Sequence, residues 1–233
     1  MATVKLGKRE TKRLLKLNIY EDEARLQGYQ IIAGIDEAGR GPLAGPVVAA
    51  ACIIPEGILI PGVNDSKQLT AEERAELYQL ITQDERIFYG VGIIDSQTID
   101  KINIFQATIA AMLMAVSQLQ QIPHMLLVDG LKLPHPTIPA QKIIDGDAKS
   151  QSIAAASVIA KETRDRLMVE FHQQWPLYRF DKHKGYGTEI HLQALQNYGV
   201  CPIHRRSYEP VKALIVQEDS QLELPFALVF NKS

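Results

Sequence analysis

The stretch at residues 33–46, "AGIDEAGRGPLAGP", places two acidic residues side by side directly after an apolar run. The run itself, "IIAGI", is short and apolar, which is typical of a buried β-strand. Asp36 and Glu37 repel each other, so a metal ion, a basic ligand or solvent has to compensate their charges. Gly39 and Gly41 follow, and glycine lets the backbone turn sharply or approach a ligand closely. We therefore expect a strand that ends in a binding site.

Short apolar runs and longer helical patterns alternate along the rest of the chain. Thr70 and Glu73 have the spacing of a capping box at the start of one helix. Three strands at the front, followed by strands that alternate with helices, predict an α/β fold with a mixed sheet. Further strands are predicted at residues 46–54, 87–94, 125–128 and 142–144, and helices at residues 70–85, 97–120, 152–175 and 188–199.

The length of 233 residues suits one large domain with appendages. We predict an N-terminal helical arm over residues 1–29, with its helix at residues 9–27. The main domain then covers residues 30–213 and ends in several helices. After about Leu214 the apolar periodicity is lost, so residues 214–233 are predicted to form a tail.

The charge distribution says more than the net charge of −2, which argues against a general polyanion binder. Residues 147–212 hold 10 Lys and Arg against 7 Asp and Glu, a local excess of +3. Residues 1–29 hold 7 bases and 4 acids, also +3. An acidic spot inside a mildly basic surface suits nucleic acid if cations fill the spot.

The chain lacks the sequence signals of membrane insertion or secretion. No apolar run approaches the roughly 20 residues of a membrane span, and the first residues lack an apolar secretory core. Cys52 and Cys201 show no spacing pattern and are interpreted as free thiols of a reducing compartment. A single disulfide between them is the alternative. We therefore expect a cytoplasmic protein.

Three apolar runs end in acidic residues: Asp36 with Glu37, Asp129 after "MLLV", and Asp147 after "KIIDG". Each acid alone is better explained as a turn or helix-capping residue. In open α/β sheets, however, ligands bind beyond the carboxyl ends of the strands. Because three acids occupy the same relative place, we favour one shared site.

The cluster offers only hard oxygen ligands, which select Mg²⁺ or Mn²⁺ over zinc or copper. Two such ions suit the in-line attack of water on a phosphodiester. A glycosidase-type pair needs only two acids, so it would leave the other acids of the cluster unexplained. Cys201 and His204 form a lone C-x-x-H, and two ligands do not make a zinc site.

Eight motifs occur in the order found in bacterial ribonuclease HII: "GIDEAGRGPLAGPV", "NDSKQLT", "KINIFQAT", "VDG", "GDAKSQSIAAASVIAK", "RDRLM", "KGYGT" and "HRRSYEP". Between residues 31 and 210 the chain therefore resembles that family. The resemblance implies a ribonuclease H-like fold, with a five-stranded mixed sheet flanked by helices and a C-terminal helical extension. It also implies an endonuclease that hydrolyses the RNA strand of RNA–DNA hybrids and nicks duplex DNA 5′ to embedded ribonucleotides, leaving 5′-phosphomonoesters.

The resemblance also assigns roles to individual residues. Two divalent ions, Mg²⁺ or Mn²⁺, are held by the same four acids that the strand-end argument selects. The motif "GRG" reads the 2′-hydroxyl, the feature that separates RNA from DNA. Asp165 is interpreted instead as a salt-bridged surface residue. The implied set is Asp36, Glu37, Asp129 and Asp147 for catalysis and metal binding, and Gly39, Arg40, Gly41, Lys67, Tyr186, Arg205 and Ser207 for the substrate. For Arg205, Arg206 and Ser207 a solvated charged face is an equally good explanation.

Alternative functions remain at this stage. A resolvase- or transposase-like DNA nuclease shares the fold and the acids, whereas a non-catalytic hybrid-binding module gains nothing from clustered carboxylates without metals. The tail segment "QLELPF" resembles the peptide by which bacterial replication proteins bind the sliding clamp. Gln221, Leu222, Leu224 and Phe226 would contact the clamp, unless the apolar tail packs on its own domain. A monomer is expected.

Overall fold

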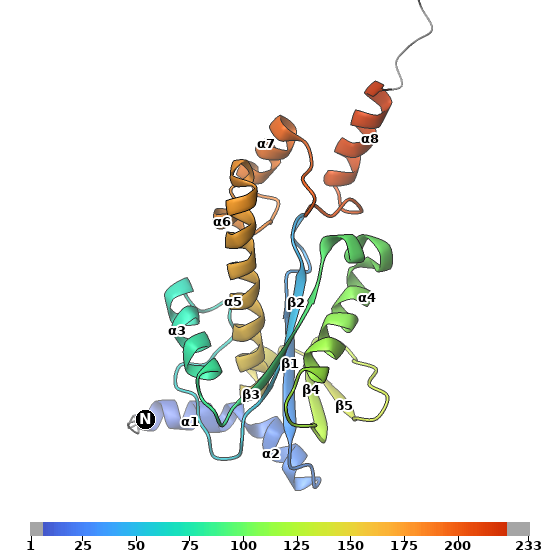
Figure 1. Ribbon diagram of the computed structural model, residues 1–233. Coiled ribbons are helices and arrows are strands. Elements are labelled where there is room, and N and C mark those ends of the chain that lie inside the picture. The colour runs from blue at the N-terminus through green and yellow to red at the C-terminus, as the bar shows by residue number, and fades with distance from the viewer. Residues whose placement is uncertain (1–6, 223–233) are drawn as a thin grey trace, which may run out of the picture.

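The computed structural model describes residues 7–222, with side chains through residue 216. Its centre is a five-stranded sheet in the order β3-β2-β1-β4-β5 (Figure 1). β1 pairs antiparallel with β2, and β2 with β3, whereas β1–β4 and β4–β5 are parallel. The predicted mixed sheet is therefore confirmed. The strands are β1 Ile32–Ala38, β2 Val47–Ile53, β3 Phe88–Ile94, β4 Met125–Asp129 and β5 Ala140–Ile143.

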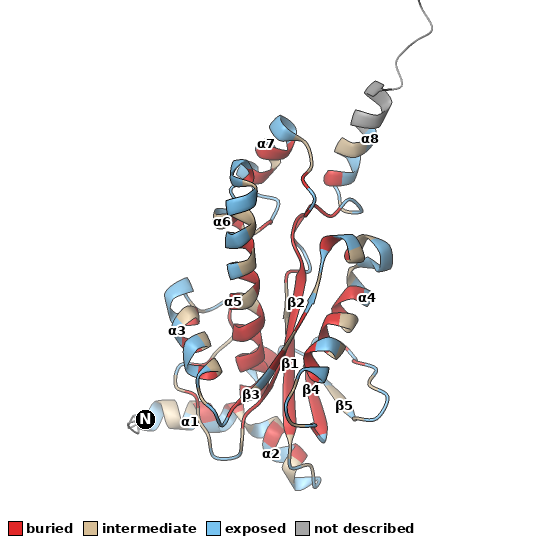
Figure 2. Ribbon diagram, viewed as in Figure 1, coloured by how far each residue is buried: buried red, intermediate tan, exposed pale blue. Residues whose placement is uncertain are grey.

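Helices cover both faces of the sheet, as expected for a ribonuclease H-like fold. One face packs against α4 (Ser96–Ser117), and the other packs against α5 (Gln151–Gln174), with α3 (Ala71–Thr82) outside α5. The helices α1 (Lys8–Leu17) and α2 (Ile19–Leu26) lie at the foot of the molecule in Figure 1. Figure 2 shows that burial is concentrated where α4 and α5 meet the sheet.

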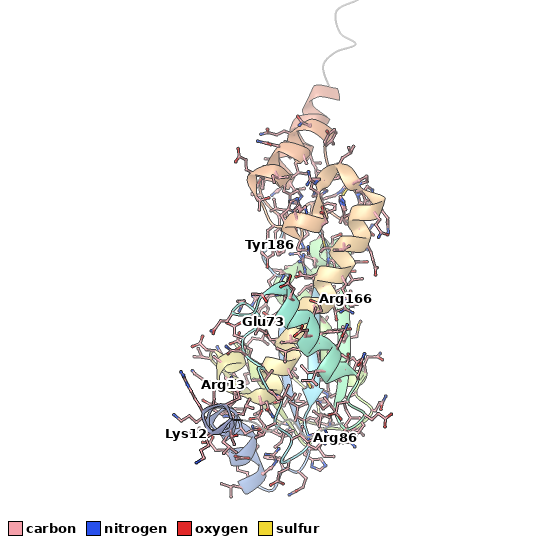
Figure 3. All side chains as sticks on the ribbon, turned by 90° about the vertical axis from the view of Figure 1, so that its left-hand side faces the viewer. Lys12, Arg13, Glu73, Arg86, Arg166 and Tyr186 are labelled. Atoms are coloured by element: carbon pink, nitrogen blue, oxygen red, sulfur yellow. The ribbon has the colours of Figure 1, made fainter. Side chains whose placement is uncertain are left out.

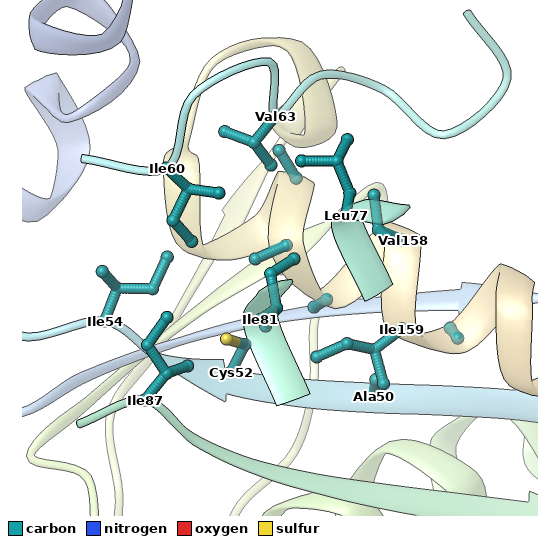
Figure 4. Close-up of a cluster of buried hydrophobic side chains, with 14 of the residues drawn as sticks. Ala50, Cys52, Ile54, Ile60, Val63, Leu77, Ile81, Ile87, Val158 and Ile159 are labelled. Carbon is teal, nitrogen blue, oxygen red and sulfur yellow. The ribbon is translucent and has the colours of Figure 1, made fainter. Parts of the chain in front are cut away.

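The long helix α5 approaches β1 very closely because small residues line the contact. A Cβ atom at Gly34 would lie 2.2 Å from the backbone nitrogen of Ile153, so only glycine fits there. Farther along, Val158 and Ile159 join Leu77 and Ile81 of α3 in a buried apolar cluster (Figure 4). This packing fixes the position of α5 relative to β1, and with it the positions of the side chains that lie between the two elements.

α4 is, by length and a mean hydropathy of 1.4, the one helix among the described residues that could cross a membrane. Its apolar side, including Ile99, Ala107 and Met112, is buried against the sheet. α4 is therefore interpreted as a core helix. It also contains a kink at Asn103, where φ is +65° and the side-chain Oδ1 accepts hydrogen bonds from the N–H groups of Phe105 and Gln106.

The last third of the chain is helical, as predicted, and extends the molecule beyond the sheet (Figure 1). It packs around Phe180, which is fully buried. The capping box at Thr70 and the end of α7 at Gly199 are also confirmed. The elements here are the 3-10 turns η1 Gly146–Ala148 and η2 Pro176–Tyr178 and the helices α6 Phe180–His183, α7 Glu189–Tyr198 and α8 Val211–Leu222.

Two boundary predictions were wrong. The single helix expected over residues 9–27 is broken at Asn18, whose side-chain amide donates to the Leu14 carbonyl and helps to end α1. The predicted tail is helical at its start, because α8 continues through residue 222 and crosses the expected boundary at 213/214. Gln221 and Leu222 therefore form the last turn of α8, whereas Leu224 and Phe226 lie outside the described residues.

Candidate active site

Strand parity brings Asp36 and Asp129 to the same face of the sheet. On β1, Ala33 and Ile35 pack on the α4 side, so Asp36 must leave the strand on the α5 side. On β4, Leu127 packs on the α5 side of the sheet. Asp129 comes two residues later and therefore leaves the strand on the same side. The parallel register aligns Gly34 with Leu127 and Ile35 with Val128, which places Asp36 and Asp129 opposite each other.

Asp147 completes a group of three carboxylates. It lies in η1, the turn that connects β5 to α5. One carboxylate oxygen from each of Asp36, Asp129 and Asp147 lies within 4.8 Å of the other two. The three strand-end acids therefore converge, as predicted.

The protein holds each member of this group in place. Asp36 is 4% exposed, and its Oδ1 accepts a 2.7 Å hydrogen bond from the N–H of Glu37. Asp129 Oδ1 accepts a 2.6 Å hydrogen bond from the N–H of Gly146. Asp147 Oδ2 lies 3.6 Å from Nζ of Lys67.

The group carries more negative charge than its surroundings compensate. Burial raises the pKa of Asp36 well above its usual value, and the neighbouring charges of Glu37 and Asp129 raise it further. Burial also raises the pKa of Asp147, with Asp65 and Asp129 adding to the effect. A bound divalent cation would reverse this effect and favour the ionised carboxylates.

Glu37 is near this group but is not a member of it. β1 continues to Ala38 instead of ending at Asp36, so Glu37 has the opposite strand parity to Asp36, yet its carboxylate still interacts with the charges of Asp129 and Lys67. Its Oε1 lies 3.4 Å from Nη1 of Arg40, and its buried Oε2 has no hydrogen-bond partner among the described residues. Burial raises its pKa as well. An unpartnered buried carboxylate oxygen beside three others fits a hard divalent cation, which takes oxygen ligands.

The loop after β1 is held by two buried arginines. Arg205 is fully buried, and its guanidinium donates to the carbonyls of Gly39, Arg40 and Gly45 at 2.5, 2.8 and 3.0 Å. Arg164 donates in the same way to Pro46, Lys184 and Ala44 at 2.9, 3.0 and 3.1 Å. With these carbonyls turned inward, the loop has a fixed shape.

This geometry corrects the expectation that Arg205 contacts phosphate. Its guanidinium has no solvent exposure and is used up by backbone carbonyls, so it supports the "GRG" loop from behind. Arg206 is exposed. Ser207 is also exposed, but its hydroxyl donates to Oδ1 of Asp100 at 2.5 Å.

Gly41 and Tyr186 form the outer surface of the loop. Tyr186 is 44% exposed, and a Cβ atom at Gly41 would meet only its ring, at 4.0 Å. The N–H groups of Arg40 and Gly41 donate no hydrogen bond to any described residue. Free amides beside an exposed aromatic ring are available to a ligand.

Several residues near the site were missed or misplaced by sequence reasoning. Asp65 lies close enough to Asp147 for its negative charge to raise the pKa of that carboxyl, and its proximity to Lys67 in the sequence was the only signal for it. Ser157 of α5 lies near Asp36, where its hydroxyl partly opposes the rise in the pKa of that carboxyl, and its Oγ is 2.8 Å from that of Ser66. The expected salt bridges of Asp165, to Arg74 and Lys161, are present, but Asp165 is buried and not on the surface.

A family model for ribonuclease HII matches residues 33–211, which include every acid described above. The chain belongs to the ribonuclease HII family. A ribonuclease HII from Chlamydia pneumoniae is 53% identical over 205 residues, covering 88% of this chain and 95% of its own.

Solved structures agree with this assignment. Ribonuclease H2 from Pyrococcus horikoshii has a TM-score of 0.65 and 28% identity, covering 80% of this chain and 98% of its own. A ribonuclease HII from Archaeoglobus fulgidus, solved in complex with PCNA, has a TM-score of 0.63 and 21% identity over 77% of this chain and 95% of its own. The predicted fold and enzyme class are thus confirmed: this member of the family is a nuclease of the ribonuclease H type.

Proposed function

We propose that this protein hydrolyses the RNA strand of RNA–DNA hybrids and nicks duplex DNA on the 5′ side of an embedded ribonucleotide. The observation that carries the proposal is the group of three carboxylates within 4.8 Å, in a chain of this nuclease family. Asp36, Asp129 and Asp147, with Glu37 beside them, would hold two divalent ions. When bound, such ions activate the attacking water and stabilise the leaving oxygen.

The protein's own groups would select and orient the substrate. The free amides of Arg40 and Gly41 suit a ribose hydroxyl or phosphate oxygen, and the exposed ring of Tyr186 suits stacking on an adjacent sugar or base. Surrounding carboxylates raise the pKa of Lys67 although partial burial opposes this, so its ammonium stays charged next to the scissile phosphate. Arg205 would act indirectly by fixing the loop.

A DNA nuclease of the resolvase or transposase type is the second candidate, because it would use the same acids. The ribose-facing surface of Gly41 and Tyr186 favours the ribonuclease. The two differ in their substrates: one requires a 2′-hydroxyl and the other does not.

The test is a DNA duplex with one ribonucleotide, incubated with the protein and Mg²⁺ or Mn²⁺. We expect a single nick 5′ to the ribonucleotide and no cleavage of an all-DNA duplex. Asp129→Asn should lower the rate at least about 10³-fold. Asp145→Asn is the matched control, since Asp145 is an exposed acid close to the site, in the turn of Asp147, and has φ of +54°, which asparagine tolerates.

Equal cleavage of the all-DNA duplex, or an intact ribonucleotide substrate with folded wild type, would overturn the proposal. Equal loss of activity in both variants would show that the Asp129 carboxylate has no specific role. Urea unfolding of each variant separates loss of activity from loss of fold.

Three further properties are proposed for the cellular role. The chain acts as a cytoplasmic monomer, which is supported by two buried free cysteines and by a site built from one chain. Its C-terminal segment, with Gln221, Leu222, Leu224 and Phe226, binds the sliding clamp, in line with the PCNA complex of the Archaeoglobus fulgidus protein. A peptide of this segment that fails to bind purified clamp at high micromolar concentration would contradict the last point.

A further inference from the structure

The helix α1 is the most basic element of the chain. Its ten residues, "KRETKRLLKL", contain five Lys and Arg and a single acid, whereas the whole protein has a net charge of −2. It precedes the segment matched by the family model, which begins at residue 33. The proposed catalytic site does not use these charges, so they require a separate explanation.

α1 is anchored to the domain by one face only. Leu14 and Leu17 are buried against the core cluster below α5. The opposite side exposes Lys8, Lys12 and Lys16, spaced four residues apart and thus about 6 Å from one another along the helix axis. Because the helix is anchored, these cations are held in a row.

No acid in the described part of the chain pairs with this row. Lys8, Arg9, Lys12 and Lys16 form no ion pair with any described residue. The one acid of α1, Glu10, bonds Arg13 at 2.7 and 2.8 Å. The hydrogen bonds from Arg13 lower the pKa of Glu10 to about 2, and a hydrogen bond from the N–H of Gly62 contributes to the same lowering. The four exposed side chains, which we call the α1 cationic face, are therefore uncompensated.

The α1 cationic face is connected to the catalytic side of the molecule. Arg13 Nη1 donates to the carbonyl of Val63 at 2.9 Å, and that loop continues to Lys67, which lies 3.6 Å from Asp147. Figure 3 shows Lys12 and Tyr186 on the same margin of the molecule, whereas Arg86 and Arg166 lie on the other. The row of cations thus lies on the same margin of the molecule as Tyr186, and α1 is bonded to the loop that carries Lys67.

We propose that the α1 cationic face binds the phosphate backbone of the substrate duplex at a distance from the cleaved bond. This inference rests on the proposed function, because it takes the ligand to be the same duplex. In this role α1 contributes to the affinity for the duplex and takes no part in the cleavage step. Lysine contacts to phosphate release counterions, so each contact contributes to the salt dependence of binding.

The test measures binding of an all-DNA duplex by fluorescence anisotropy between 50 and 300 mM salt, with cleavage of the ribonucleotide substrate measured in parallel. Lys8→Gln/Lys12→Gln/Lys16→Gln should reduce the slope of log K against log salt by roughly 1 to 2.7 and weaken binding about tenfold at 150 mM salt. In the cleavage assay KM should rise and kcat should stay unchanged. Arg86→Gln/Arg166→Gln, on the opposite margin, should leave the slope at the wild-type value.

An unchanged slope in the triple variant, or an equal change in both variants, would overturn the inference. A fall in kcat at unchanged KM would do the same, since it would place α1 in the chemistry. Wild type that binds DNA with the expected slope but cuts nothing would refute the proposed function alone. All three substituted lysines are exposed, and a circular dichroism spectrum confirms that the variant is folded.

Discussion

Arg164 and Arg205 are buried cations that form no ion pair with an acid among the described residues. Burial lowers the pKa of both guanidinium groups, that of Arg164 to about 10, yet both remain charged at neutral pH. Each is stable because three backbone carbonyls accept its hydrogen bonds. The planar fork of arginine is what matches three separate carbonyls at once.

Arg205→Lys keeps the charge but removes this fork. It should lower the free energy of unfolding by about 2–4 kcal/mol, because a buried ammonium leaves carbonyls of the loop unpaired. Urea unfolding measures the change. Arg206→Lys, at the neighbouring exposed position, should change stability by less than about 0.5 kcal/mol. Equal effects of the two substitutions would contradict the supporting role of Arg205.

At this scale the sequence predicted the acids better than the arginines. Asp36, Asp129 and Asp147 each follow an apolar strand, so their positions could be deduced from periodicity alone. Arg205 sits in a basic motif that is equally typical of a phosphate contact. Its burial depends on loop carbonyls about 160 residues away, which no local pattern encodes.

At the scale of elements, all five strands and the long helices were predicted within a few residues. Strong apolar periodicity made these predictions reliable. Two irregularities lie where a polar side chain competes with the helix: Asn18 separates α1 from α2, and Asn103 kinks α4. β1 runs two residues past Asp36 because β2 pairs with it as far as Ala38, and a single strand cannot reveal how far its partner extends.

The C-terminal helices are joined by three buried histidines. His191 and His204 share a hydrogen bond of 3.0 Å between their Nε2 atoms, and His183 stacks on His191 at 4.4 Å. All three rings pack against Phe180. Burial lowers the pKa of His191 and of His204 to about 4, so both are neutral near pH 7.

Acid should therefore destabilise this layer. Between pH 6.5 and 4 the unfolded chain binds more protons at His191 and His204 than the folded chain, so stability is full above pH 6.5 and falls as pH decreases. Lowering the pH from 7 to 5 should cost about 2 kcal/mol or more from these groups. Urea unfolding at the two pH values measures it.

His204→Gln should weaken this pH dependence, and His124→Gln, at an exposed position, should leave it unchanged. Identical pH profiles for wild type and His204→Gln would contradict the assignment.

For the whole molecule, the site lies where separate parts of the chain meet. The sheet supplies Asp36 and Asp129, the turn before α5 supplies Asp147, and the loop held by α1 supplies Lys67. A net charge of −2 is compatible with nucleic acid binding because bound cations would neutralise the acids of the site, and α1 is positive. Both the three-acid group and the uncompensated face of α1 depend on this assembly.

The central claim, that the three clustered aspartates hold divalent ions, is tested most directly by titrating the protein with Mn²⁺ in a calorimeter, without substrate. Wild type and Asp145→Asn should bind with the same affinity, whereas Asp129→Asn should bind about tenfold or more weakly, because it removes one charged ligand. If Asp129→Asn binds Mn²⁺ as tightly as wild type, the aspartates are not the metal site.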